Sequence, residues 1–230
     1  MKVIGLIGGI SWESSLEYYR IINKAVKERL GGFHSAKCIL YSLDFDEVVR
    51  LQHEGKWHEL ARLMTNAAVK LEWAGAELLL ICANTMHKVA DHVQERVRIP
   101  LIHIIDVTAE RILERGIKRV GLLGTRFTME DGFYRKRMGE RFNIEVLLPD
   151  KDERELVHRI IYEELCQGVI RQSSKESIRK IIERLKLKGA EGIILGCTEL
   201  PLLIKQGDVD IPVFDTTKIH AIAAVEHALK

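Results

Sequence analysis

Residues 75–85 of this chain read Gly-Ala-Glu-Leu-Leu-Leu-Ile-Cys-Ala-Asn-Thr, and residues 189–199 read Gly-Ala-Glu-Gly-Ile-Ile-Leu-Gly-Cys-Thr-Glu. Each stretch is an apolar run that ends in small polar residues, which is typical of a buried parallel strand followed by a loop. The two stretches align without a gap, and Ala83 then lies opposite Cys197. Because α/β folds place their chemistry at such strand ends, we expect functional groups in both loops.

Two more pairs of segments extend this alignment. The segment around Gly5 (Val-Ile-Gly-Leu-Ile-Gly-Gly) matches the segment around Gly121 (Val-Gly-Leu-Leu-Gly-Thr). Residues 99–102 (Ile-Pro-Leu-Ile) match residues 211–214 (Ile-Pro-Val-Phe). Three matches in the same order indicate two similar halves. The alternative is a chance likeness between ordinary βα units, in which Gly-Ala-Glu before an apolar run is common.

Apolar runs alternate with longer amphipathic stretches, which predicts strands separated by helices and largely parallel sheets. We therefore expect two pseudo-symmetric α/β domains, the first formed by residues 1–106 plus 215–230 and the second by residues 107–214. The predicted strands are residues 2–8, 36–43, 77–83, 100–104, 118–124, 143–148, 191–196 and 211–214. The predicted helices are residues 13–29, 57–73, 87–96, 107–115, 130–141, 153–167, 174–188, 199–205 and 217–229.

The composition excludes several classes of protein. The chain has 230 residues and a net charge of +2, and no basic stripe stands out, so nucleic-acid or membrane-surface binding has no support. The longest apolar run, about eight residues, is too short to span a bilayer. Four cysteines without paired spacing favour a reducing compartment, which predicts a cytoplasmic protein.

Cys197 is the strongest candidate for a reactive group. Pro201 suits the first turn of a helix, so Cys197 would lie just before a helix N-terminus, where the dipole favours a thiolate. A thiolate there can remove a proton from carbon or attack carbon. The alternative is an inert core cysteine, which is how we interpret Cys38 and Cys166. Cys82 is a weaker substitute thiol, because strand alternation points it away from the side that Ala83 faces.

The loops after the strands have polar groups suited to a small carboxylate. Asn84 and Thr85 follow one strand, and Thr198 and Glu199 follow its counterpart. The turn at residues 8–12 lacks the spacing of a dinucleotide or phosphate-binding loop. It predicts either an anion-binding turn with free N–H groups or a simple packing turn.

Two further groups of residues have weaker signals. Thr125 and Thr128 follow a strand in the loop that corresponds to residues 9–12, and a ligand role for them is open. His87 and His92 are five residues apart and face different sides of a helix, so we expect no metal site.

Four motifs together resemble the aspartate/glutamate racemase family, and the match runs in order along nearly the whole chain. They are Gly8-Gly9-Ile10-Ser11-Trp12-Glu13-Ser14, Ala83-Asn84-Thr85-Met86-His87, Gly124-Thr125 and Gly196-Cys197-Thr198-Glu199-Leu200-Pro201. Glu199 favours the aspartate racemases and the aspartate/glutamate-specific racemases, since glutamate racemases of the cell-wall pathway usually have His after Cys-Thr.

The resemblance implies a cofactor-independent enzyme that racemises a small acidic amino acid in an active site between its two domains, and a homodimer. Two acid/base residues act on opposite faces of the substrate Cα. Both are usually Cys, and in some relatives the first is Thr. Cys197 matches the second residue, but Ala83 occupies the place of the first and cannot transfer a proton.

Three explanations of Ala83 stay open. In the first, Ala83 replaces a native Cys or Thr in a variant that traps substrate. In the second, the chain is a one-base enzyme in which Cys197, water or Cys82 completes the reaction. In the third, the chain has another activity, such as that of a single-cysteine decarboxylase or isomerase of a small dicarboxylate, or it only binds dicarboxylates.

The resemblance also suggests which residues contact the substrate, and Arg50 or Arg126 could supply a cation for its second carboxylate. The expected substrate-binding residues are Ile10, Ser11, Trp12, Gln52, Asn84, Thr85, Thr125, Thr128, Glu164, Thr198 and Glu199.

Overall fold

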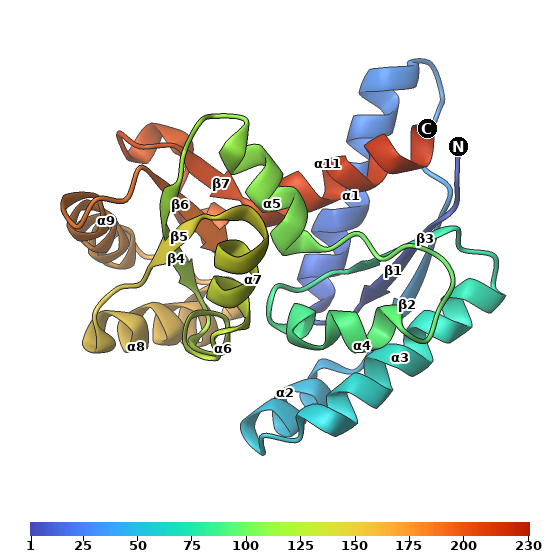
Figure 1. Cartoon of the computed structure of the whole chain (residues 1–230), viewed down its shortest axis with the longest axis horizontal. Helices are drawn as coiled ribbons and strands as arrows, with labels where there is room; N and C mark the ends of the chain where they lie inside the picture. The colour runs from blue at the N-terminus through green and yellow to red at the C-terminus, as the bar shows by residue number, and fades with distance from the viewer. The chain divides into compact units, whose positions relative to one another are not determined.

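The computed structural model describes all 230 residues, and they divide into two compact units. Unit 1 comprises Met1–Ile104 and Thr217–Lys230, and unit 2 comprises Ile105–Thr216. Each unit contains one parallel β-sheet with helices on both faces (Figure 1), which confirms the predicted α/β class.

Unit 1 has a three-stranded sheet in the order β2-β1-β3. The central strand β1 is buried along its whole length because it pairs with a strand on each side. The strands are β1 (Ile4–Gly8), β2 (Cys38–Ser42) and β3 (Leu78–Ile81). The helices are α1 (Trp12–Leu30), α2 (Phe45–His53), α3 (Trp57–Trp73), the 3₁₀ turn η1 (Thr85–Val89), α4 (Ala90–Gln94) and α11 (Thr216–Leu229).

The helices of unit 1 form two layers around this sheet (Figure 1). On one side, α1 lies beside α11, and Arg29 of α1 pairs with Glu226 of α11 at 2.8 Å. On the other side, apolar residues of α2, α3, η1 and α4 form one buried cluster with β1 and β3, which includes Met64, Leu79 and Met86. The loop after β3 is therefore supported by a packed core on its helix side.

Unit 2 has a four-stranded sheet in the order β5-β4-β6-β7. The strands are β4 (Arg119–Gly124), β5 (Glu145–Leu147), β6 (Gly192–Gly196) and β7 (Val213–Asp215). The helices are α5 (Ile104–Leu113), α6 (Arg126–Glu130), α7 (Phe133–Phe142), α8 (Lys151–Arg159), the π-helical turn η2 (Ile160–Glu164), the 3₁₀ turn η3 (Leu165–Gln167), α9 (Gln172–Leu187), α10 (Leu200–Leu203) and the 3₁₀ turn η4 (Gln206–Asp208).

In unit 2, α5 and α7 lie on one face of the sheet and α8 and α9 on the other (Figure 1), and a charged pair joins the two helices of each face. Arg137 of α7 makes a bidentate contact with Asp106 of α5, with two hydrogen bonds of 2.5 and 2.8 Å. Both side chains are largely buried, which makes this a better anchored pair than a surface ion pair. On the other face, Arg184 of α9 pairs with Glu153 of α8.

The strand registers reproduce the sequence alignment of the two halves. Ile4 pairs with Leu78 in unit 1, and the aligned residues Val120 and Gly192 pair in unit 2. An isolated parallel bridge joins Leu79 to Leu101, and the aligned pair in unit 2 is Ile193 with Val213. The repeat in the sequence is therefore a repeat of backbone pairing.

The repeated Gly-Ala-Glu has the same local purpose in both units. Gly75 and Gly189 have φ of 96° and 98°, which only glycine adopts readily, and each ends the preceding helix. The carboxylate of Glu77 accepts a hydrogen bond from Val3 N–H at 2.7 Å, and that of Glu191 accepts one from Arg119 N–H at 3.0 Å. The motif thus joins the start of one strand to the start of its neighbour.

Several predicted element boundaries are wrong. No strand covers residues 100–104, because only Leu101 pairs with the sheet and the Ile102 carbonyl instead contacts the His220 ring at 2.7 Å. The predicted helix 87–96 is split into η1 and α4, and the α-helical part of 153–167 ends at Arg159.

Two short helices, α2 and α6, were not predicted. Asp44 and Thr125 cap them, and each of these side chains accepts a hydrogen bond from a backbone N–H of the first turn. The predicted helix 130–141 begins only at Phe133, because Gly132 before it is left-handed, with φ of 77°.

Candidate active site

The two aligned strand ends place Ala83 and Cys197 at equivalent points. Each lies shortly after its strand, β3 or β6, and each is 8 % exposed. Position 83 presents a methyl group, whereas position 197 presents a thiol. The backbone frame is shared, so the chemical difference lies in the side chains alone.

The Cys197 thiol is paired with a carboxylate. Its Sγ donates a hydrogen bond to Oε2 of Glu199 at 2.8 Å, and Glu199 is also only 8 % exposed. Burial raises the pKa of the Cys197 thiol well above its ordinary value, and the negative charge of Glu199 raises it further.

These effects oppose the thiolate that a helix dipole was expected to favour at Cys197. The helix α10 does begin near Cys197, with Pro201 in its first turn, but it has four residues. The dipole of so short a helix is small compared with the effects of burial and an adjacent carboxylate.

Tyr162 faces this pair from the π-helical turn η2. Burial raises the pKa of the Tyr162 phenol, and its electrostatic interactions with Cys197, Cys166 and Glu199 raise it further. Its ring lies 4.7 Å from the ring of His158. A π-helical turn inside an α-helix is common at functional sites because it re-aims side chains. Here it brings a phenol toward the thiol.

Thr125 and Thr128 lie at the end of the neighbouring strand β4. Thr125 caps α6, and its hydroxyl lies 3.2 Å from that of Thr128. Both are buried. A Cβ on Gly124 would come within 3.2 Å of Thr128, and one on Gly196 within 3.4 Å, so Thr128 packs over the two paired strand ends. The two threonine hydroxyls therefore lie at the same end of the sheet as Cys197.

Glu164 has partners of its own in unit 2. Ser174 donates a hydrogen bond to its carboxylate at 2.6 Å, and Arg171 lies 3.6 Å from it. Arg126, a candidate cation, is exposed, and its backbone N–H donates to Nδ1 of His158 at 3.3 Å. Thr198 is half-buried between Cys197 and Glu199.

In unit 1, the loop after β3 is fixed by a histidine. The Nδ1–H of His87 donates to the carbonyl of Ala83 at 2.8 Å. Asn84 and Thr85 are buried beside it. Ile10 belongs to the same apolar cluster as Ala83. Position 83 thus has a rigid backbone and an apolar surrounding.

His87 is part of a buried group of imidazoles. Its ring lies 4.7 Å from that of His103 and 5.4 Å from that of His220. Nε2 of His220 donates to the Ile102 carbonyl, so its Nδ1 has a lone pair and accepts from the Tyr18 hydroxyl at 2.8 Å. Burial lowers the pKa of His220 well below its ordinary value, and His87 lowers it further. This histidine is held neutral.

The other predicted residues of unit 1 differ in exposure. Ser11 caps α1 by accepting a hydrogen bond from Ser14 N–H, and Trp12 is 64 % exposed. Gln52 of α2 is 4 % exposed, and its buried Oε1 has no hydrogen-bond partner within the chain. An unpaired buried amide oxygen is costly, so Gln52 fits a ligand-binding position. Arg50 is exposed and pairs with Glu54 at 3.6 Å.

Cys82 is a poor substitute for a missing acid/base residue. Its side chain is fully buried, and burial raises the pKa of its thiol. Its carbonyl accepts a hydrogen bond from the Ser14 hydroxyl at 2.6 Å, which joins the loop after β3 to α1. Cys82 is therefore a packed core residue.

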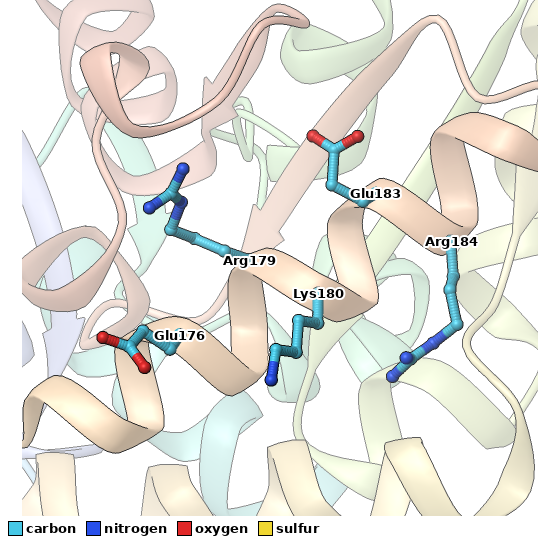
Figure 2. Close-up of a pocket in the computed structure, with 5 residues that line it drawn as sticks. All are labelled: Glu176, Arg179, Lys180, Glu183 and Arg184. Carbon is cyan, nitrogen blue, oxygen red and sulfur yellow. The ribbon is translucent and has the colours of Figure 1, made fainter.

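A surface hollow of about 430 Å³ lies elsewhere on unit 2. Figure 2 shows that its lining side chains come from the single helix α9, with Arg179 and Glu183 on one side and Lys180 and Arg184 on the other. None of the predicted site residues lines it. The structure has no group of three or more His, Cys, Asp or Glu arranged for a metal ion, and no helix long and apolar enough to cross a membrane.

A family model described as Asp/Glu/hydantoin racemase matches residues 7–224. The chain belongs to this racemase family. A protein from Yersinia pestis described as a candidate Asp/Glu racemase is 55 % identical, with a TM-score of 0.95 over the whole of both chains. An aspartate racemase homologue from Pyrococcus horikoshii OT3 is 44 % identical, with a TM-score of 0.89 over the whole of both chains.

A sequence relative agrees with this family. The broad specificity amino-acid racemase RacX of Bacillus subtilis (strain 168) is 25 % identical over 167 residues, which cover 73 % of this chain and 71 % of RacX. The resemblance inferred from the motifs is thus confirmed, and membership of the racemase family supports amino-acid racemase activity.

Sequence reasoning missed three features of this racemase-family chain. Tyr162 was not predicted, although it lies two residues before the predicted Glu164 in the same helical segment. The pairing of Cys197 with Glu199 could have been found from their Cys-x-Glu spacing, which places both side chains in one loop. The imidazole group could not, because His87, His103 and His220 are far apart in the sequence.

Proposed function

We propose that this chain is a racemase of acidic amino acids, aspartate first and glutamate second, which exchanges the Cα proton without a cofactor. The observation that supports this most is the buried Cys197 thiol, hydrogen-bonded to Glu199 at the end of β6 in a chain of the racemase family. Relatives described as aspartate racemase homologues agree with the acidic substrate.

Cys197 would act as the acid/base group of one face. As a thiolate it removes the Cα proton, and as a thiol it returns one. The carbanion formed between these steps needs hydrogen-bond donors in a site that excludes water. We assign this role and the binding of the substrate's polar groups to Ile10, Ser11, Trp12, Gln52, Asn84, Thr85, Thr125, Thr128, Glu164, Thr198 and Glu199.

Because position 83 is alanine, we expect the rate of racemisation to be limited. A methyl group has no exchangeable proton, so the face assigned to position 83 has to use water or react slowly. We therefore propose a racemase that is slow or one-sided, in which Cys197 handles one enantiomer directly.

The test is proton NMR of L-aspartate and D-aspartate, each incubated with the protein in D2O, followed by chiral chromatography. Loss of the Cα proton signal with inversion is the result of a working racemase. Exchange of one enantiomer without inversion shows Cys197 acting alone on one face. Exchange of neither aspartate nor glutamate would contradict the proposal.

Ala83 also favours a second candidate, a decarboxylase of a small dicarboxylate. Such an enzyme needs one thiol to protonate a carbanion from one face, and of the two equivalent positions only 197 has a thiol. Loss of carbon dioxide from a disubstituted malonate distinguishes it from the racemase. A protein that only binds dicarboxylates would be stabilised by them without turnover.

We further propose a cytoplasmic homodimer. Size-exclusion chromatography with light scattering measures the mass directly, and a mass near that of the 26.3 kDa chain would contradict the dimer.

A further inference from the structure

Cys197 and Glu199 form a direct thiol–carboxylate hydrogen bond in the loop between β6 and α10. Their side chains are buried to the same degree, and Sγ lies 2.8 Å from Oε2. An ionised carboxylate has no hydrogen to donate, so the proton in this contact is the thiol's. The contact therefore has one proton and one negative charge, held within a site that excludes solvent.

This arrangement creates a problem for the proposed function. A thiol must lose its proton before it can act as a base. Sending that proton to solvent would leave two negative charges, on Cys197 and Glu199, in a buried place. Like charges at this distance strongly oppose each other, and burial disfavours both.

We infer that Glu199 is the proton acceptor for Cys197, an inference that rests on the proposed racemase function. The proton moves from Sγ to Oε2, and the S–H electron pair stays on sulfur. Glu199 becomes a neutral carboxylic acid and Cys197 a thiolate, so the buried contact still has one negative charge. The thiolate then takes the Cα proton, and the carbanion keeps the C–H electron pair. In the reverse direction Cys197 returns a proton to carbon and regains one from Glu199.

The other half of the chain supplies an independent observation. Position 83, equivalent to Cys197, is alanine, and position 85, equivalent to Glu199, is threonine. The loop that has no thiol at the position equivalent to Cys197 thus also lacks the carboxylate at the position equivalent to Glu199. The strand pairing that leads into the two loops is the same, so the thiol and the carboxylate are present together in one loop and absent together from the equivalent positions of the other.

Other titratable groups around the contact do not replace Glu199. The neighbours from η2 and η3 are Tyr162, whose pKa Cys197 and Glu199 raise, and Cys166, which raises the pKa of Cys197. A phenol and a thiol are neutral acids at rest, so neither can take a proton from Cys197. The Arg126 guanidinium is near enough to Tyr162 to affect it, and it is a cation without a lone pair for a proton.

The test compares Glu199→Gln with the wild type, and Glu176→Gln on the exposed part of α9 is the matched control. The first readout is the pH midpoint for alkylation of Cys197 by iodoacetamide, followed by mass spectrometry of the peptide that contains Cys197. Removing the carboxylate's charge should lower this midpoint. Because the thiolate is the nucleophile, a midpoint that is lower by one on the pH scale makes alkylation at neutral pH about 10-fold faster.

The second readout is Cα exchange of aspartate in D2O. Loss of the proton acceptor should slow exchange in Glu199→Gln by at least about 100-fold, a typical contribution of general acid–base catalysis. Faster alkylation together with slower exchange is the expected signature. If alkylation and Cα exchange both became faster in Glu199→Gln, Glu199 would accept the thiol's hydrogen bond without taking its proton during exchange, and the inference would be overturned. An unchanged alkylation midpoint would also overturn it.

Circular dichroism checks that the variants fold, and Glu199→Asp serves as the conservative variant. It keeps a carboxylate on a shorter side chain, so it should exchange faster than Glu199→Gln; exchange no faster would overturn the inference. If the wild type exchanges neither enantiomer of aspartate or glutamate, the proposed function fails. In that case the pH midpoint for alkylation, compared between the wild type and Glu199→Gln, still decides whether the Glu199 carboxylate keeps the proton on the Cys197 thiol.

Discussion

The loop after β3 and the loop after β6 start from the same backbone pairing but have different chemistry. In unit 2, Cys197 and Glu199 share a proton at 2.8 Å. In unit 1, Ala83 and Thr85 occupy these positions, and the His87 ring donates a hydrogen bond to the Ala83 carbonyl at 2.8 Å. In our proposal the loop after β6 moves a proton, whereas the hydrogen bond of His87 fixes the backbone of the loop after β3.

This difference shows that a duplicated frame can keep its geometry after one copy changes its reactive group. Gly75, Glu77 and the pairing of Ile4 with Leu78 are all retained in unit 1. The residues that fix the backbone are therefore separate from the residues that we propose to transfer protons. The comparison can be tested by changing each set in turn.

The largest effect should come from Cys197→Ala, which removes the only thiol at the two equivalent positions. We expect Cα exchange of aspartate to fall by at least about 1,000-fold, since the loss of an essential acid/base residue costs several kcal/mol of transition-state stabilisation. Exchange in D2O measures this, with Cys38→Ala as the control thiol. Exchange that survived in full would rule out Cys197 as the acid/base group.

A smaller effect, in the opposite direction, is expected from Ala83→Cys and Ala83→Thr. Either change restores a group that can exchange a proton at the position equivalent to Cys197. We expect racemisation to increase about 10- to 100-fold, at the lower end of what a positioned acid/base group contributes. Chiral chromatography from each enantiomer measures the rate. An unchanged rate would mean that position 83 is not the first acid/base position and that the alignment of the loops is wrong.

The shared frame itself can be tested with Gly5→Ala and Gly121→Ala. A Cβ at Gly5 would lie 2.8 Å from the Leu79 side chain, and one at Gly121 would lie 2.7 Å from that of Ile193, the aligned residue. Both changes overpack a buried strand pair, which typically costs about 1–3 kcal/mol. Urea unfolding should show two similar losses. A large loss in only one variant would show that the packing of the two central strands is not equivalent.

The sequence predicted the frame well because the frame depends on local patterns. The apolar runs of β3 and β6 and the helix-ending glycines Gly75 and Gly189 can all be found by eye. The motif around Cys197 also led to the correct family. These features depend on residues that are close together in the chain.

The protonation of the site could not be predicted in this way. The pKa of the Cys197 thiol is raised by its burial and by the adjacent Glu199, and neither follows from a one-dimensional pattern. Tyr162 interacts electrostatically with Cys197 from η2, a π-helical turn that has no simple sequence signal. The strand expected at residues 100–104 failed because His220, more than one hundred residues away, takes the Ile102 carbonyl.

The smallest expected effect concerns the stability of unit 1, where the imidazole group lies beside the loop after β3. His220 has a lowered pKa because it is buried and faces His87, with Tyr18 and Ile102 bonded to its two nitrogens. In the unfolded chain the same histidine is protonated near its usual pKa of about 6.5. The unfolded state therefore binds more protons than the folded state below that pH, so the folded state loses stability as the pH falls. We expect about 1 kcal/mol less unfolding free energy at pH 5.5 than at pH 7.5 from this residue.

Urea unfolding at both pH values measures the loss. It should shrink in His220→Asn and persist in His34→Asn, which changes an exposed histidine of the same unit. The same loss in both variants would show that the imidazole group is not what makes unit 1 sensitive to acid.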